Sequence, residues 1–273
     1  MILTSQKAIA LKEHGYVQIP YEKHINYFIK TTMELWKKFH NQELSHKLKF
    51  VFGEEGGYEY KGPTDPDYKE NFHISLSYNP DYPWMTNIDR DFICAAQKLI
   101  FESMNIALEV AGILDEGTDT FNVPGLTNES QNSWMLRLLH YPPRESKDLL
   151  AIPHIDKAVT IHLDEDAPGL QILWKNEWQS VEPMAGHVLA YPGMLGQYYS
   201  ECEFPALCHR VQATEQTCLK GRNSIVLFVR FGDVVYDKGT FGKTQERFPN
   251  GENYDLSFLE FEKFFTDLEN KVL

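Results

Sequence analysis

The sequence predicts a mainly β protein of the α+β class, with a double-stranded β-helix (jelly-roll) core, a helical N-terminal region and a C-terminal helix. Within 134–231, short apolar runs are separated by turn residues about every 8–12 positions, which is typical of a β-sandwich or barrel. Before residue 130, apolar residues instead recur at helical spacing. We therefore expect a mixed, helix-rich region at 1–130, the double-stranded β-helix core at 131–235 and a helical tail at 236–273.

The elements outside the core are predicted from apolar spacing and turn residues. The stretches 21–39 and 90–114 have the pattern of amphipathic helices. The segment 53–66 is rich in Gly, Pro and acidic residues and is predicted to be a loop, and the polar stretch 115–132 is predicted to be a hinge. A capping-box pattern that begins at Ser257 predicts the start of the C-terminal helix.

The apolar runs of the core region predict consecutive short strands, as a jelly roll requires. Lys175 and Asn176 lie between two of these runs and predict a hairpin turn, because Asn tolerates a left-handed backbone conformation. The predicted strands are 134–141, 149–155, 159–163, 170–174, 178–181, 187–191, 206–213 and 224–231.

Composition narrows the class of protein. The 273-residue chain has a formal net charge of −13, which argues against nucleic acid or an anionic membrane as a main partner. No apolar run approaches the roughly 20 residues of a membrane span, and no signal peptide is apparent. The four cysteines lack CxxC spacing, so we expect a reduced, cytoplasmic setting. The sequence does not predict an oligomeric state.

Three polar residues of the core predict a metal site. His154 and Asp156 are two positions apart, so in a strand their side chains project to the same face. His209, on a later strand, is placed to complete a triad of two histidines and one aspartate. Non-haem Fe(II) sites use these ligands when other coordination positions must stay open. Arg222 and Ser224 also share a strand face, where a guanidinium and a hydroxyl would suit one end of a dicarboxylate.

The sequence around these residues resembles a known family. A Tyr-Pro-Pro sequence begins at Tyr141, and a Gly-Leu-Gln-Ile-Leu sequence ends at Leu173 and is followed by Glu177-Trp178. A His-Arg-Val sequence begins at His209. On these motifs the chain resembles the isopenicillin N synthase-like iron(II)/2-oxoglutarate-dependent oxygenases. It departs from many plant members at Leu139, where they have Asn.

The resemblance implies cofactors, a reaction and residue roles. The triad would bind Fe(II), which would chelate 2-oxoglutarate through its keto and C1-carboxylate oxygens and leave a position for O2. Arg222 would pair with the distal carboxylate of 2-oxoglutarate, and Ser224 and Tyr141 would each donate a hydrogen bond to it. The expected reaction is hydroxylation or desaturation of a small organic substrate, with release of succinate and CO2.

Substrate contacts are expected from residues at the mouth of the barrel. Aromatic or polarisable side chains there would suit a partly apolar small molecule, although such residues are as often packing residues. The candidates are Phe72, His73, Met194, Tyr198 and Phe204.

Two other functions use the same residues. An iron oxidase could hold the triad without using 2-oxoglutarate, and a non-catalytic protein could bind the metal and 2-oxoglutarate only. Dependence of turnover on 2-oxoglutarate would separate these possibilities. Among the other histidines, His162 is expected to be a hydrogen-bonded structural residue, and His140 to point away from the cosubstrate because it alternates with Tyr141.

Overall fold

The structure is a computed structural model and describes residues 2–53, 55–116, 134–145, 148–200, 203–230, 240–241 and 256–257. The predicted domain boundaries at 130/131 and 235/236 therefore lie outside the described residues, as does most of the predicted hinge. None of the helices in these ranges has the length and apolar character needed to cross a membrane.

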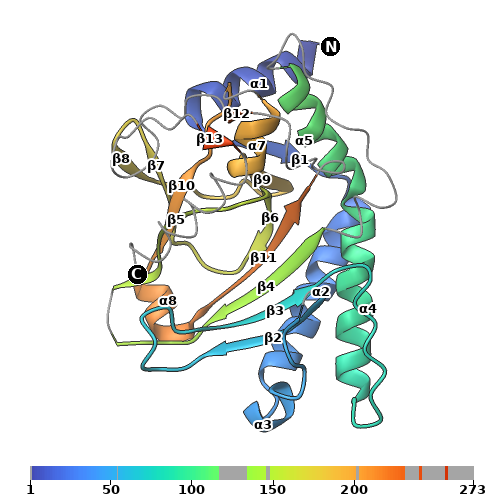
Figure 1. The fold of residues 1–273 in the computed structure, drawn as a ribbon. Coiled ribbons are helices and arrows are strands. Elements are labelled where there is room, and N and C mark those ends of the chain that lie inside the picture. The colour runs from blue at the N-terminus through green and yellow to red at the C-terminus, as the bar shows by residue number, and fades with distance from the viewer. Residues whose placement is uncertain are drawn as a thin grey trace.

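Two antiparallel sheets form the centre of the molecule (Figure 1). The larger has the strand order β1-β9-β6-β11-β4-β3-β2 and the smaller the order β5-β10-β7-β8. From β4 to β11 the chain passes back and forth between the sheets, which confirms the predicted double-stranded β-helix. The strands are β1 Val17–Pro20, β2 Gly56–Lys61, β3 Lys69–Ile74, β4 Met135–Tyr141, β5 Leu149–Ile155, β6 Val159–Glu165, β7 Leu170–Trp174, β8 Glu177–Ser180, β9 His187–Tyr191, β10 Cys208–Gln212, β11 Arg222–Val229, β12 Thr240–Phe241 and β13 Leu256–Ser257.

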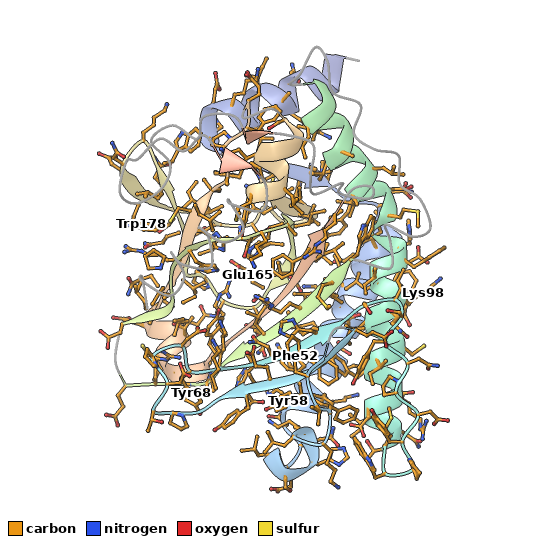
Figure 2. All side chains as sticks on the ribbon, viewed as in Figure 1. Phe52, Tyr58, Tyr68, Lys98, Glu165 and Trp178 are labelled. Carbon is orange, nitrogen blue, oxygen red and sulfur yellow. The ribbon has the colours of Figure 1, made fainter. Side chains whose placement is uncertain are left out.

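Strand β4 shows how the larger sheet separates the site from the hydrophobic core. Leu136 and Leu138 are fully buried in the core cluster on one face. The alternate residues Arg137, Leu139 and Tyr141 line a pocket on the other face. One face of this sheet therefore stabilises the fold while the other is available for chemistry. Figure 2 shows how densely side chains fill the molecule around the sheets.

Helices cover the outer face of the larger sheet. Figure 1 shows α2 and α4 packed against it, and Phe39 of α2 and Phe92 of α4 stack with ring centroids 4.9 Å apart. Trp36 of α2 donates a hydrogen bond of 3.2 Å to the Leu139 carbonyl, which ties the helix to β4. The helices are α1 Ile2–His14, α2 Lys23–His40, α3 Leu44–Lys47, α4 Asn87–Glu102, α5 Met104–Glu116, α7 Met194–Tyr199 and α8 Glu215–Lys220.

Three elements differ from the prediction. The single helix expected at 90–114 is two helices that meet at Ser103, whose hydroxyl donates to the Leu99 carbonyl at 2.8 Å and competes with the helical backbone. The loop expected at 53–66 contains β2, which lies so close to β3 that a Cβ on Gly56 would be 2.3 Å from the His73 carbonyl oxygen. The segment before Arg222, for which no element was predicted, contains α8.

The predicted hairpin is confirmed. The predicted start of the C-terminal helix is wrong, because the residue at that position lies in a strand. Lys175 and Asn176 both have positive φ, 52° and 65°, and join β7 to β8. Ser257 lies in β13, which pairs with β12, rather than at a helix N-terminus. The rest of the expected helix lies outside the described residues.

Candidate metal and cosubstrate site

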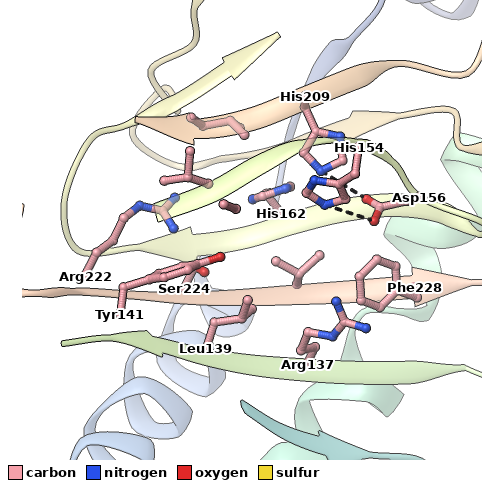
Figure 3. A pocket seen from close by; sticks show the side chains of 14 residues that line it. Arg137, Leu139, Tyr141, His154, Asp156, His162, His209, Arg222, Ser224 and Phe228 are labelled. Carbon is pink, nitrogen blue, oxygen red and sulfur yellow. Dashed lines mark ion pairs between the residues drawn. The ribbon is translucent and has the colours of Figure 1, made fainter. Parts of the chain in front are cut away.

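The smaller sheet brings the three predicted ligands together. His154 of β5 and His209 of β10 are directly opposite each other in the antiparallel pair, and Asp156 follows β5 by one residue. The Asp156 carboxylate lies 3.4 Å from His209 Nε2 and 3.9 Å from His154 Nε2. One donor atom from each of the three residues lies within 4.8 Å of the others. Figure 3 shows all three side chains converging on one point.

Backbone carbonyls orient both imidazoles. His154 Nδ1 is 2.7 Å from the Ile152 carbonyl oxygen, and His209 Nδ1 is 3.2 Å from that of Leu207. A carbonyl accepts only, so each Nδ1 carries a proton, and in the neutral imidazole the Nε2 lone pair is directed at Asp156. Hydrogen bonds of this kind fix the tautomer of metal-binding histidines. The geometry thus suits a metal ion at the Nε2 atoms.

Asp156 is held by its side chain and by its backbone. Its carboxylate accepts a 2.8 Å hydrogen bond from the Thr160 hydroxyl, and its carbonyl accepts one of 2.9 Å from the Met194 backbone N–H. The chain before Met194 passes so close that a Cβ on Gly193 would be 2.4 Å from the Asp156 carbonyl oxygen and 2.0 Å from that of Ala158. A glycine at 193 is therefore needed to position the carboxylate ligand.

Gly193→Ala is expected to destabilise the fold by about 1–3 kcal/mol because the added methyl group overlaps backbone atoms. It should also lower Fe(II) affinity by at least about 10-fold, because the turn that carries Asp156 must move. Denaturant unfolding and metal titration measure the two effects. The matched control is Gly112→Ala in α5, where a Cβ would meet nothing within 4 Å and should stabilise the helix by about 0.5–1 kcal/mol. If Gly193→Ala and Gly112→Ala had the same stability and the same Fe(II) affinity, Gly193 would not be needed to position Asp156.

Burial and mutual charge set the protonation of the triad. Desolvation, and next the neighbouring His209, lower the pKa of His154 to about 4. Burial alone would raise the pKa of Asp156, yet the two histidines beside it hold that pKa below its usual value. At neutral pH the site therefore presents a neutral imidazole at His154 and an ionised carboxylate at Asp156, which are the forms that bind a metal. The His154 side chain is 32% exposed and that of His209 6%, so the site is open on the His154 side.

Arg222 lies at the other end of the same pocket. Its side chain is 1% exposed, its Nε donates to the Ala167 carbonyl at 3.0 Å, and its guanidinium forms an ion pair with Glu165. Tyr141 faces Arg222 across the β4–β11 pair, and Ser224 shares its strand face. Tyr141 and Ser224 are both buried and line the pocket. A cation and two hydroxyl donors therefore converge on one region.

The space between these two groups, about 390 Å³ including the part that is open to solvent, forms one pocket. It opens between the two sheets, with the triad on one side and β4 and β11 on the other (Figure 3). Its described lining residues are Arg137, Leu139, Tyr141, Ala151, His154, Asp156, His162, Leu170, His209, Val211, Arg222, Ser224, Val226 and Phe228.

The expected substrate contacts need correction. Phe72, Met194 and Phe204 are 0%, 1% and 0% exposed in the hydrophobic core and do not line the pocket. Phe72 pairs with Leu138, so it faces the helices, whereas the pocket face of β3 carries its neighbour His73. His73 is buried beside Arg137 but is not among the lining residues. The side chain of Tyr198 lies outside the described residues.

The site includes residues that sequence reasoning missed or gave a structural role. His162 is hydrogen-bonded as expected, with its Nε2 2.9 Å from the Tyr191 hydroxyl, and it also lines the pocket. Its buried Nδ1 has no hydrogen-bond partner within the described ranges. Arg137 and Phe228 line the pocket, and Glu165 lies beside it, without belonging to a recognised motif.

Strand alternation could have found two of these residues. Counting back from Tyr141 in steps of two reaches Arg137, and counting forward from Arg222 in the same way reaches Phe228. Both therefore fall on the pocket face of their strands. The same alternation places His140 on the opposite face, where it stacks on His40 of α2, as expected.

The residues fit the groups implied by the sequence. Two imidazoles and one carboxylate on one side of an open pocket are the donor set of a non-haem Fe(II) site with free positions. The cation and hydroxyls around Arg222 fit the far carboxylate of a dicarboxylate such as 2-oxoglutarate. Ionised Glu165 does not fit a bound dicarboxylate well, because its carboxylate already pairs with part of the Arg222 guanidinium.

Known proteins with related sequences are named as a dioxygenase or as homologues of an oxidase. Residues 132–231 match the family model of the 2OG-Fe(II) oxygenase superfamily. Gibberellin 2-beta-dioxygenase 8 of Arabidopsis thaliana is 24% identical over 75% of this chain and 62% of its own length. The 1-aminocyclopropane-1-carboxylate oxidase homolog 12 of the same plant is 26% identical over 67% of this chain and 50% of its own. The chain thus spans about half to three fifths of the length of these relatives.

Solved structures support the fold. A full-length protein from Neurospora crassa, in complex with alpha-KG and 5-formyluracil, superposes with a TM-score of 0.71 at 18% identity, over 97% of this chain and 89% of that one. The dioxygenase for auxin oxidation from rice gives a TM-score of 0.68 at 16% identity, over 97% and 89%. The triad, the jelly-roll topology and the family match agree with the resemblance found in the sequence. Residues 132–231 thus match the model of the 2OG-Fe(II) oxygenase superfamily, and the triad and the strand topology agree with that match.

Proposed function

We propose that the protein is an Fe(II)- and 2-oxoglutarate-dependent dioxygenase that hydroxylates or desaturates a small organic substrate, releasing succinate and CO2. The observation that carries this proposal is the position of a His-Asp-His triad and a buried arginine at two ends of one open pocket. The triad provides three ligands and leaves the pocket side free, as an oxygenase that must bind a cosubstrate and O2 requires.

His154, Asp156 and His209 would hold the iron, which supplies the activation of O2 coupled to oxidation of 2-oxoglutarate. Arg222 would bind the distal carboxylate, and the hydroxyls of Tyr141 and Ser224 would donate hydrogen bonds to it. Burial raises the pKa of Tyr141 to about 12, so its hydroxyl keeps its proton and remains a donor at neutral pH. Tyr141, Arg222 and Ser224 are all buried, and charge-assisted hydrogen bonds are stronger at buried positions than in water.

A small-molecule substrate is favoured over nucleic acid by the chain's net charge of −13. The names of the related proteins refer to a gibberellin, an auxin and 1-aminocyclopropane-1-carboxylate, and the Neurospora crassa protein was solved with 5-formyluracil. The absence of a nucleic-acid partner and the cytoplasmic location stay predictions from composition.

The proposal is tested by succinate formation from 2-oxoglutarate. With Fe(II), O2 and no added substrate, such enzymes are expected to turn over slowly, so the purified protein should form succinate that depends on both 2-oxoglutarate and iron. Turnover of a substrate without consumption of 2-oxoglutarate would favour the iron oxidase. Tight binding of iron and 2-oxoglutarate without any succinate, across a panel of substrates, would favour the non-catalytic binding protein.

Glu165 is expected to make 2-oxoglutarate binding depend on pH. Burial raises the pKa of Glu165, against the opposing effect of Arg222 and with smaller contributions from the carboxylates of Asp164 and Asp166. Ionised Glu165 competes with the cosubstrate carboxylate for Arg222, whereas protonated Glu165 does not. The affinity for 2-oxoglutarate should therefore be highest below the pKa of Glu165 and fall as pH rises through it, by up to about 10-fold per pH unit for one proton.

Glu165→Gln removes the competing charge and keeps the shape of the side chain. It is expected to bind 2-oxoglutarate more tightly than the wild type above neutral pH and to lose most of the pH dependence. Calorimetric titrations between about pH 5.5 and 8 in buffers of different ionisation enthalpy measure affinity and proton uptake together. A wild-type affinity that is flat with pH, with no proton uptake, would contradict this role of Glu165.

A further inference from the structure

The pocket contains a second arginine that the proposed roles do not use. Arg137 projects from β4 into the pocket, and its guanidinium carbon lies 4.7 Å from the centre of the Phe228 ring. Among the described residues, its buried Nε has no hydrogen-bond partner and its guanidinium has no ion pair. A cation held against an aromatic ring without a counter-ion is a binding group for an anion.

The neighbouring carboxylates already have partners. Asp156 belongs to the triad, and Glu165 is paired with Arg222. On β2 the Glu59 carboxylate accepts a 2.8 Å hydrogen bond from Asn71, and Asp67 forms ion pairs with Lys61 and Lys69. The strand neighbour His73 is neutral, because burial lowers its pKa to about 4. No described carboxylate is thus left to neutralise Arg137.

The two arginines lie at separate places along the same pair of strands. Arg222 pairs with Tyr141, and Arg137 pairs with Val226, four residues further along β11. At the rise of a β-strand this separation is about 13 Å. Figure 3 shows Arg222 at one end of the pocket and Arg137 and Phe228 at the other, with the triad above them. A cosubstrate that spans from the metal to Arg222 leaves the region around Arg137 and Phe228 free.

We infer that Arg137 and Phe228 form the substrate subsite, and that the substrate is an organic monoanion of the carboxylate class with an apolar body. The guanidinium binds the carboxylate, while Phe228 and Val226 contact the apolar part and hold a neighbouring carbon towards the triad. This inference rests on the proposed oxygenase function and names the chemistry that selects its substrate. Arg137 determines specificity and takes no part in the metal site.

Matched pairs of acids and amides test this assignment. Benzoate and benzamide, phenylacetate and phenylacetamide, and hexanoate and hexanamide are titrated by calorimetry into the anaerobic Fe(II)–2-oxoglutarate protein. We expect at least one acid to bind at least about 10-fold more tightly than its amide, because only the acid forms a charge-assisted pair. Arg137→Met should abolish this preference, and Arg137→Lys should keep part of it. Amides that bind as well as acids, or no binding by any acid, would overturn the assignment.

Arg210 provides a matched control. It lies on β10 between His209 and Val211, so its side chain faces away from the pocket, and it stacks on Trp178 at 4.1 Å and donates to Gln171 at 2.8 Å. Arg210→Met removes a similar stacked cation and should leave the preference for acids unchanged. A preference that survives Arg137→Met, or that disappears equally in both variants, would place the anion elsewhere.

The affinity for 2-oxoglutarate separates failure of this inference from failure of the proposed function. Arg137→Met should bind iron and 2-oxoglutarate within about 3-fold of the wild type. If it loses 2-oxoglutarate as strongly as a variant of Arg222 does, Arg137 belongs to the cosubstrate site and the substrate assignment is wrong. If the wild type binds neither iron nor 2-oxoglutarate, the oxygenase function fails, and the substrate subsite fails with it.

Discussion

Asp156→Ala is expected to lower Fe(II) affinity by more than about 100-fold and to abolish succinate formation. Loss of a group that only orients a metal ligand costs about 10–100-fold, and loss of the ligand itself should cost more. Asp156 supplies the carboxylate of the triad, and its negative charge lies next to the two Nε2 atoms. Without it, two imidazoles remain, which form a weak site for a divalent cation. Metal content after anaerobic loading, together with succinate formation, measures the loss.

Asp164→Ala is the matched control for this substitution. Asp164 lies on β6, is ion-paired with the exposed Lys30 at 3.0 Å and does not line the pocket. Because an exposed ion pair contributes at most about 1 kcal/mol, this variant should keep iron, succinate formation and nearly all of its stability. Iron binding by Asp156→Ala at the wild-type level would show that the metal is held elsewhere.

Arg222→Met is expected to weaken 2-oxoglutarate binding by about 2–5 kcal/mol, which corresponds to about 30-fold to several thousand-fold in affinity. The guanidinium is buried and is placed beside both the Tyr141 and Ser224 hydroxyls. Iron affinity should stay unchanged, because Arg222 does not contact the triad. Anaerobic calorimetry of the iron-loaded protein measures both affinities.

Arg222→Met also removes the cation that pairs with Glu165. The variant is therefore expected to lose stability as well as affinity for 2-oxoglutarate. The double variant Arg222→Met/Glu165→Gln removes both charges and should regain stability without regaining affinity for 2-oxoglutarate. Arg210→Met, which removes an arginine outside the pocket, should keep wild-type affinity. Wild-type affinity in the double variant would contradict the assignment of Arg222 as the anchor.

The positions of two of the metal ligands could be predicted from the sequence because they depend on a local rule. The two-residue spacing of His154 and Asp156 places them on one face of any strand, and the same holds for Arg222 and Ser224. A jelly roll brings together strands that are distant in the sequence, and His209 lies on β10, which neighbours β5.

Which of the expected substrate contacts enter the hydrophobic core could not be predicted, because it depends on which strands pair. Phe72 and His73 are adjacent, and only the pairing of Phe72 with Leu138 decides that Phe72 enters the core. Met194 resembles a residue at the barrel mouth in sequence, yet its side chain packs into the core where α7 begins behind Asp156. The ion pair of Glu165 with Arg222 joins residues on two strands and leaves no trace in the spacing of either.

The central claim is that the triad and Arg222 hold iron and 2-oxoglutarate in one pocket. Anaerobic titration of the Fe(II)-loaded protein with 2-oxoglutarate, followed by visible absorbance, tests it most directly. We expect a weak metal-to-ligand charge-transfer band that saturates with one equivalent of 2-oxoglutarate, is absent in Asp156→Ala and needs much more 2-oxoglutarate in Arg222→Met. Iron binding without this band would contradict the claim and favour an oxidase that does not use 2-oxoglutarate.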